Sequence, residues 1–191
     1  MATVTTAKPP VNGDNIWDND GSYEVVDGLR VELLPMSFLA HRLAGIIFAA
    51  LEAYGELNDR GQAVMEALFH LPLPVNRLRR PDVAYISSER FPRSRPIPWP
   101  DNAIDLAPDL AVKIASPSDL LAEIATKLDE YFRAGVRCVW IVYPNLGLVQ
   151  VYDSLTECKG YTRTDTLDGG KVLPGFSLPL AKLFAQAPQN P

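Results

Sequence analysis

Residues 108–144 read PDLAVKIASPSDLLAEIATKLDEYFRAGVRCVWIVYP and contain the pattern that decides the fold. Within them, Leu110–Ala115 and Val136–Val142 are short apolar runs of the kind that form buried strands. The Ser-Pro-Ser-Asp sequence at 116–119 is expected to end the first strand and to cap a helix that runs to about Arg133. Because a helix of this length suits a crossover connection, the two strands are predicted to be parallel. This stretch indicates a mixed sheet with helices on its faces.

The N-terminal part predicts a β-hairpin followed by a helix. Tyr23–Val26 and Leu29–Leu34 are apolar runs joined by Asp27-Gly28, which favours a two-residue hairpin turn. From Phe38 to about Asn58 the apolar residues recur at helical spacing, and Ser37 is a suitable N-cap.

The remaining segments add strands, a loop and a short helix. Five prolines between residues 88 and 108 predict a long loop. Asp168-Gly169-Gly170 predicts a second hairpin between strands at 161–164 and 171–173. Further strands are expected at Ala63–Leu71, Asp82–Ser87 and Leu148–Tyr152, and a helix near Leu180–Phe184.

Composition restricts the class of protein. The chain has 191 residues, which suits a single domain over residues 21–186, preceded by a polar, flexible arm at 1–20. It has no long apolar run, so we expect no membrane span. The two cysteines form no CxxC pair, which excludes a cysteine-cage zinc site and favours the reducing cytoplasm. The net charge of −5 gives no overall attraction for nucleic acid, so a DNA site would have to be a local patch.

One such patch is predicted from the arginines between residues 77 and 95. Arg77, Arg79 and Arg80 head this cluster, and guanidinium groups can hold phosphates through planar, bidentate contacts. The alternative is an ordinary solvated surface.

No motif for a dinucleotide, a P-loop, a nucleophile elbow or an HExxH zinc site is present. Carboxylate chemistry is therefore the best enzymatic option. Its candidates are the two Pro-Asp pairs, Pro81-Asp82 and Pro108-Asp109, because each places an acid at the start of a strand.

Five segments together resemble a large bacterial family of putative restriction endonucleases with the PD-(D/E)XK nuclease fold. The resemblance covers about residues 22–185 and implies a restriction endonuclease-like α+β fold: a mixed sheet of four or five strands flanked by helices, with an N-terminal β-hairpin. It also implies DNA as partner, Mg²⁺ or Mn²⁺ as cofactor, and a homodimer. The segments are YEVVDGLRVELLPMS, LRRPDVAYISSERF, APDLAVKIASPSD, KLDEYFRAGVRCVWIVYP and VLPGFSLPLAKLF.

By this resemblance, Asp82 takes the place of the first metal-binding acid. Lys127 takes the place of a lysine that orients the attacking water and stabilises developing negative charge. On a helical wheel Lys127 also lies at the edge of the apolar stripe of its helix, from which its amine can reach the ends of the strands. The stripe predicted to be buried consists of Leu120, Leu121, Ile124, Ala125, Leu128, Tyr131 and Phe132. Snorkelling at a helix edge is the alternative.

The chain departs from the family at Lys113, which stands where the second metal-binding acid belongs. Strand alternation points Lys113 to the expected metal position, and a unit charge about 4 Å from a divalent cation repels it by about 8 kcal/mol at an effective dielectric of 20. Lys113 could swing aside while Glu66 or Asp109 ligates, be partly neutral, or form an ion pair with Asp82. We favour the ion pair. Glu66 and Glu32 are the other carboxylates predicted to reach the site.

The sequence therefore predicts a Mg²⁺-dependent DNA endonuclease that hydrolyses phosphodiesters and is weak or inactive because of Lys113. The alternative is a non-catalytic protein of the nuclease fold that binds DNA or a protein partner.

Overall fold

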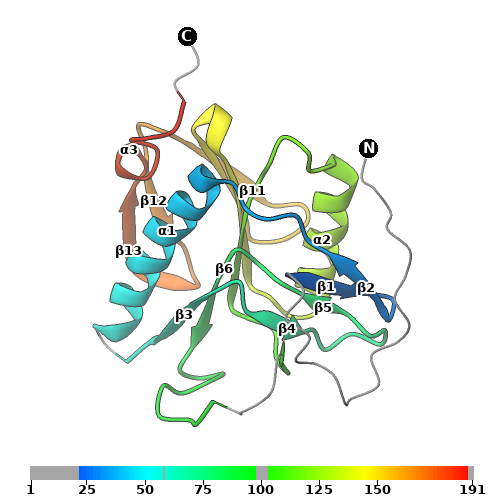
Figure 1. The fold of residues 1–191 in the computed structure, drawn as a ribbon. Coiled ribbons are helices and arrows are strands. Elements are labelled where there is room, and N and C mark those ends of the chain that lie inside the picture. Colours follow the sequence, from blue (N-terminus) through cyan, green and yellow to red (C-terminus); the bar gives the residue numbers. More distant parts are fainter. Residues whose placement is uncertain (1–21, 58, 98–102, 189–191) are drawn as a thin grey trace.

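The computed structural model describes residues 22–57, 59–97 and 103–188. The predicted arm at residues 1–20 lies outside this part of the chain. The described part is a mixed α+β fold built on one large sheet (Figure 1).

The large sheet contains six strands, which is at least one more than the resemblance implies. They are β3 (Gly61–Met65), β6 (Val83–Ser87), β8 (Leu110–Ile114), β9 (Cys138–Tyr143), β10 (Leu148–Tyr152) and β11 (Cys158–Thr162). Their order across the sheet is β11-β10-β9-β8-β6-β3. The pair β8 and β9 is parallel, with Leu110 opposite Cys138, and the other pairs are antiparallel. The predicted parallel crossover is confirmed.

The crossover element is α2 (Leu121–Arg133), which covers one face of this sheet. The opposite face is covered by α1 (Phe38–Glu56), α3 (Leu180–Leu183) and a two-stranded sheet (Figure 1). The two strands of that sheet are β12 (Thr166–Gly169) and β13 (Leu173–Pro179). Each face has its own apolar core because successive residues of a strand point to opposite sides.

Strand β8 shows this division clearly. Leu110, Val112 and Ile114 pack in the core beneath α1, whereas Ala111 packs in the core beneath α2. Lys113 is on the same side of β8 as Ala111, as the alternation predicts.

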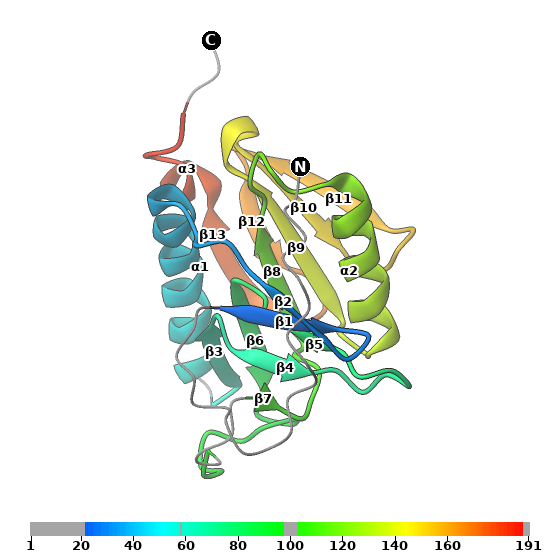
Figure 2. The same cartoon turned by 45° about the vertical axis from the view of Figure 1, so that its right-hand side comes forward.

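A smaller sheet lies across one end of the large sheet (Figure 2). Its order is β2 (Leu29–Glu32), β1 (Tyr23–Val26), β5 (Leu78–Arg79), β4 (Leu68–His70) and β7 (Ala103–Ile104). Strands β1 and β2 form the predicted hairpin, in which Asp27 and Gly28 have φ of 51° and 78°. Positive φ at both positions is the geometry that a two-residue type I′ turn requires.

Several local predictions need correction. The strand expected at Ala63–Leu71 is divided into β3 and β4, because Glu66 between them has a φ of 47° and takes the chain from one sheet to the other. The predicted loop at 88–108 contains the short strand β7, while its residues 98–102 lie outside the described part. The hairpin around Asp168-Gly169-Gly170 joins β12 to β13, whereas Tyr161 belongs to β11 and pairs with β10.

The predicted N-cap is found at the start of α1 but not at the start of α2. Helix α2 begins after Leu120, whose side chain makes no capping hydrogen bond. Asp119 instead accepts a hydrogen bond from the backbone N–H of Ser116 at 2.8 Å. Leu120 and Leu121, placed in the buried stripe by periodicity, are 56% and 80% exposed. The prediction of Ser37 as the N-cap of α1 is confirmed, since its hydroxyl accepts from Ala40 N–H at 3.2 Å.

Candidate functional site

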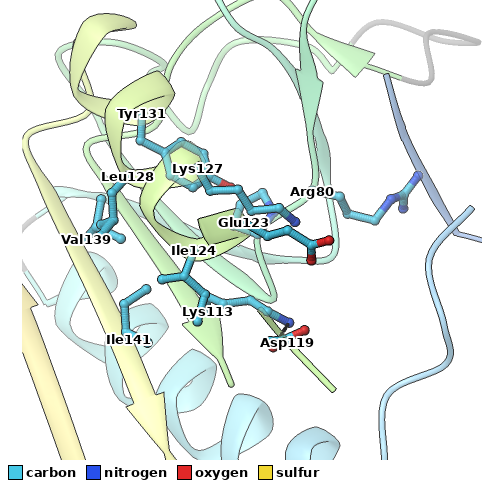
Figure 3. A pocket seen from close by; sticks show the side chains of 11 residues that line it. Arg80, Lys113, Asp119, Glu123, Ile124, Lys127, Leu128, Tyr131, Val139 and Ile141 are labelled. Carbon is cyan, nitrogen blue, oxygen red and sulfur yellow. Dashed lines mark ion pairs between the residues drawn. The ribbon is translucent and has the colours of Figure 1, made fainter. Parts of the chain in front are cut away.

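A pocket lies between α2 and the strands β8 and β9, beside the loop that precedes β6 (Figure 3). Its floor is apolar and its rim is charged, so it combines exclusion of water with oriented polar groups. It is lined by Arg80, Pro81, Lys113, Asp119, Glu123, Ile124, Lys127, Leu128, Tyr131, Val139 and Ile141.

Asp82 does not line this pocket itself but follows Pro81 and contacts Lys113, both of which do, and the strand register places it there. Val83 pairs with Val112, so Asp82, one residue earlier, lies across from Lys113. The backbone N–H of Asp82 donates to the carbonyl of Val112 at 3.0 Å, and its Oδ2 accepts from Ile114 N–H at 2.5 Å. The side chain is thereby fixed on the α2 face of the sheet.

Burial raises the pKa of Asp82 above its ordinary value, although Lys113, the Ile114 N–H and Lys127 act in the opposite direction. The residue is 7% exposed, so removal of water from the carboxylate is the larger effect.

Lys113 forms the predicted ion pair. Its Nζ lies 3.5 Å from Asp82 Oδ2 and 3.6 Å from Asp119 Oδ2, and its side chain is 27% exposed. The ammonium thus lies between two carboxylates, as a cation shared by both. In Figure 3 the Lys113 side chain runs from β8 toward Asp119 at the mouth of the pocket.

Lys127 reaches the same pocket from α2, as its place on the helical wheel predicts. Its Nζ contacts the carboxylate of Glu24 at 2.9 Å and 3.1 Å rather than bonding directly to Asp82. Its charge still acts on Asp82, because it opposes the rise in the pKa of that carboxyl group that burial causes. Lys127 is therefore a pocket cation attached to the N-terminal hairpin.

Glu24 is the residue that the sequence reasoning missed, because it was assigned to the hairpin alone. It is 2% exposed, and its carboxylate also pairs with Arg79 at 2.7 Å and accepts from Arg80 N–H at 3.1 Å. Burial raises the pKa of Glu24, but the charges of Lys127 and Arg79, together with hydrogen bonds from Lys127 and from the backbone N–H of Arg80, outweigh it, so the pKa is lowered overall. The sequence signal for a functional role of Glu24 was that it is the single acidic residue among the apolar residues of Tyr23–Val26.

The arginine cluster does not form the predicted DNA surface as a unit. Arg77 and Arg79 are 7% and 4% exposed, and both pair with Glu130 of α2. A guanidinium group buried among carboxylates is not available to a phosphate, which corrects the expectation for these two residues. Arg80 does line the pocket, while its guanidinium donates to the carbonyls of Tyr23 and Glu66.

The three remaining carboxylate candidates, like Asp82, are not among the residues that line the pocket. Asp109 is fully buried, where it pairs with Arg90 at 3.1 Å and accepts from Ser87 N–H at 2.7 Å. The backbone of Glu66 accepts from Arg80 and donates to the carbonyl of Asp82 at 3.3 Å. Glu32 lies on the exposed strand β2, where it accepts from Arg30 at 2.6 Å. Their roles as ligands stay predictions.

The donor set in this arrangement does not fit a divalent cation. Mg²⁺ and Mn²⁺ need several oxygen ligands, and the described residues contain no group of three acidic, histidine or cysteine side chains suited to a metal. The ammonium of Lys113 contacts the Asp82 carboxylate, and the oxygens of Glu24 are engaged by Arg79, Arg80 and Lys127. The place between Asp82 and Asp119 is thus taken by the single charge of a lysine.

Comparisons with known proteins agree with this fold. The model of the Uma2 family, described as putative restriction endonuclease, matches residues 15–181. The chain is also similar to the crystal structure of a putative nuclease belonging to DUF820 from Anabaena variabilis ATCC 29413, with a TM-score of 0.73 and 16% identity over 85% of this chain and 89% of that one. A search of curated proteins gave no significant match.

Proposed function

The chain belongs to the Uma2 family of putative restriction endonucleases, and on that premise we propose that it binds DNA at the pocket lined by Lys113 and Lys127, beside Asp82, but hydrolyses phosphodiesters weakly or not at all. The observation that carries the proposal is the contact of 3.5 Å between Lys113 Nζ and Asp82 Oδ2. It supports a site in which an ammonium has taken the position of a metal ion.

An ammonium and a divalent metal ion share one capacity and differ in another. Both neutralise phosphate charge, and Lys113 and Lys127 each have a partly exposed side chain that lines the pocket. Restriction endonuclease-like proteins generally use divalent metals, because the metal also lowers the pKa of a bound water so that hydroxide forms near neutral pH. An ammonium cannot activate water in this way, so we expect the protein to bind DNA but to hydrolyse it weakly or not at all.

The direct test is to restore the acid. We expect Lys113→Glu to bind Mn²⁺ in calorimetry where the natural protein does not, because the introduced carboxylate and that of Asp82 then supply oxygen ligands from adjacent strands. The matched control is Lys113→Glu combined with Asp82→Asn, which should lose that affinity. Equal Mn²⁺ binding by the natural protein and by Lys113→Glu would contradict the proposal.

Plasmid cleavage separates the proposal from the second candidate function, an active Mg²⁺-dependent endonuclease. The observation that favours this candidate is that Lys113 also contacts Asp119 at 3.6 Å, so rotation onto Asp119 would release Asp82. Cutting of supercoiled plasmid by the natural protein that disappears in Asp82→Asn would establish the second candidate. Cutting only by Lys113→Glu would support the first.

DNA binding itself is tested without metal. Fluorescence anisotropy with a labelled duplex should show binding that weakens with salt and that Lys113→Gln and Lys127→Gln both reduce. Failure to bind duplex or single-stranded DNA at low salt would leave a protein partner as the ligand. We further propose, from the family resemblance and the cysteine usage, that the protein acts in the cytoplasm as a homodimer.

A further inference from the structure

Helix α2 carries an apolar stripe that runs out of the pocket and ends on the surface. Leu121, Ile124 and Leu128 are three and four residues apart, so they lie within about 60° of arc on one side of the helix. Ile124 and Leu128 line the pocket and are 9% and 7% exposed, whereas Leu121 is 80% exposed. Leu120, the residue before the helix, is 56% exposed. The apolar surface of the pocket therefore continues to two leucines in contact with water.

These two leucines do not stabilise the fold. Leu120 occupies the N-cap position of α2 without a side-chain capping bond, and leucine is among the least favourable residues at an N-cap. The side chain of Leu121 stays largely in water, so it gains little of the free energy that burial gives to an apolar group. Contact with a ligand would give both side chains a role.

The polar groups beside the stripe leave one carboxylate available. Glu123 and Lys127 are four residues apart on α2, the spacing at which glutamate and lysine commonly pair. Lys127 Nζ instead contacts Glu24 at 2.9 Å and 3.1 Å. Among the described residues, none forms a hydrogen bond or an ion pair with the carboxylate of Glu123. In Figure 3 the side chains of Lys113, Glu123 and Lys127 extend toward the same opening.

The mouth of the pocket thus offers three kinds of contact, and a nucleotide can use all of them. The amines of Lys113 and Lys127 suit a phosphate, and exposed apolar side chains suit the face of a base. A carboxylate repels phosphate but accepts N–H groups such as the amino group of cytosine. Base faces are stacked on one another in a duplex and become accessible in a single strand.

We infer that the mouth of the pocket binds an unpaired nucleotide of single-stranded DNA. The base lies against Leu120 and Leu121, its amino edge donates to Glu123, and its phosphate lies near the two pocket amines. This inference rests on the proposed DNA binding, and it narrows the ligand from DNA in general to DNA with unpaired bases.

Fluorescence anisotropy tests the preference with a labelled single strand and a labelled duplex of equal length, at the same salt concentration and without metal. We expect the single strand to bind at least about tenfold more tightly, because base contacts add to the phosphate contacts that both ligands share. Lys113→Gln should weaken the binding of both ligands, since it removes a phosphate contact.

The exposed leucines provide the decisive variant. Leu120→Ser combined with Leu121→Ser should lose the preference for the single strand and leave duplex binding unchanged. Serine is a favourable N-cap residue, so the variant should fold, and circular dichroism checks this. The matched control is Leu57→Ser, which changes a leucine that is 79% exposed at the end of α1, on the opposite face of the sheet. It should keep the preference.

The role of Glu123 is tested with oligodeoxycytidine and oligothymidine. We expect tighter binding of the cytosine strand, because cytosine has an amino group where thymine has a carbonyl oxygen. Glu123→Ala should remove this difference, whereas Glu157→Ala, which removes an exposed acid on the turn before β11, should retain it. If Glu123 only repels phosphate, its removal raises both affinities equally and leaves their ratio unchanged, which would overturn this assignment.

The outcomes separate this inference from the proposed function. Duplex binding as tight as single-strand binding, or a preference that the double leucine variant retains, would overturn the inference while the proposed DNA binding stands. Binding of neither ligand would overturn both and would leave the pocket to a protein partner.

Discussion

Two clusters of charged side chains lie close to one another in this protein and differ in burial and geometry. In the pocket, Lys113 is 27% exposed and contacts Asp82 and Asp119 at 3.5 Å and 3.6 Å. In the second cluster, the side chain of Arg79 is 5% exposed and contacts Glu24 and Glu130 at 2.7 Å and 2.6 Å. Loose contacts open to water are adjustable and suit a site that meets a ligand. Short contacts without water join structural elements and cannot be exchanged cheaply.

The buried cluster links three separate elements. Glu24 comes from the N-terminal hairpin, Arg79 from β5 and Glu130 from the crossover helix α2. Through Glu24 it also holds Lys127 at the pocket. The buried cluster therefore positions one of the cations of the exposed cluster.

The largest expected effect breaks the buried cluster. Arg79→Ala removes the guanidinium that pairs with the buried carboxylates of both Glu24 and Glu130, and we expect a loss of about 3–5 kcal/mol in the free energy of unfolding, measured by urea denaturation. The control is Arg133→Ala, which removes an exposed pair with Asp129 and should cost no more than about 0.5 kcal/mol. Equal losses in the two variants would show that burial does not distinguish these pairs.

A smaller loss is expected from Glu24→Gln, about 1–3 kcal/mol at neutral pH, because it leaves charged partners with a neutral amide. The pKa of Glu24 is lowered in the folded protein, so its carboxylate contributes stability above its unfolded pKa and loses it as the pH falls through the folded pKa. Unfolding measured from neutral to acidic pH should therefore show a shallower loss in Glu24→Gln than in the natural protein. A parallel pair of pH profiles would contradict this assignment.

The smallest effect on stability is expected from Asp82→Asn, which should stabilise the folded protein slightly at neutral pH. Burial raises the folded pKa of Asp82, so its contribution to stability is present below its unfolded pKa and is lost as the pH rises through the folded pKa. Asp82→Asn, whose amide oxygen can still accept from Ile114 N–H, should slightly raise the thermal midpoint at neutral pH and leave it unchanged in acid. A lower midpoint at neutral pH would mean that the pair with Lys113 outweighs the burial of the carboxylate.

Much of the framework could be predicted because it depends on local pattern. The hairpin turn at Asp27-Gly28, the cap at Ser37 and the parallel pair β8–β9 all follow from residues close together in the chain. Alternation along β8 likewise predicted the side on which Lys113 lies, and pairing with Asp82 followed from opposite charge.

Predictions failed where long-range contacts override local preference. Periodicity assigned Leu121 to the core, yet it is 80% exposed, and it left Glu130 outside the apolar stripe although that residue is 5% exposed. Arg77 and Arg79 are the residue type that binds phosphate, but carboxylates from elsewhere in the chain pair with both of them. These are the buried Glu24 and Glu130 and the exposed Asp27.

The sequence by itself determined the family, the mixed sheet and the side of β8 on which Lys113 lies, because each follows from residue type and spacing. The tertiary structure alone decided which charges share a site. Glu24 and Lys127 are 103 residues apart in the chain and within 3.1 Å in space, and no local pattern encodes that distance. Whether a charged side chain serves a ligand or the fold depends on how much water its neighbours leave around it.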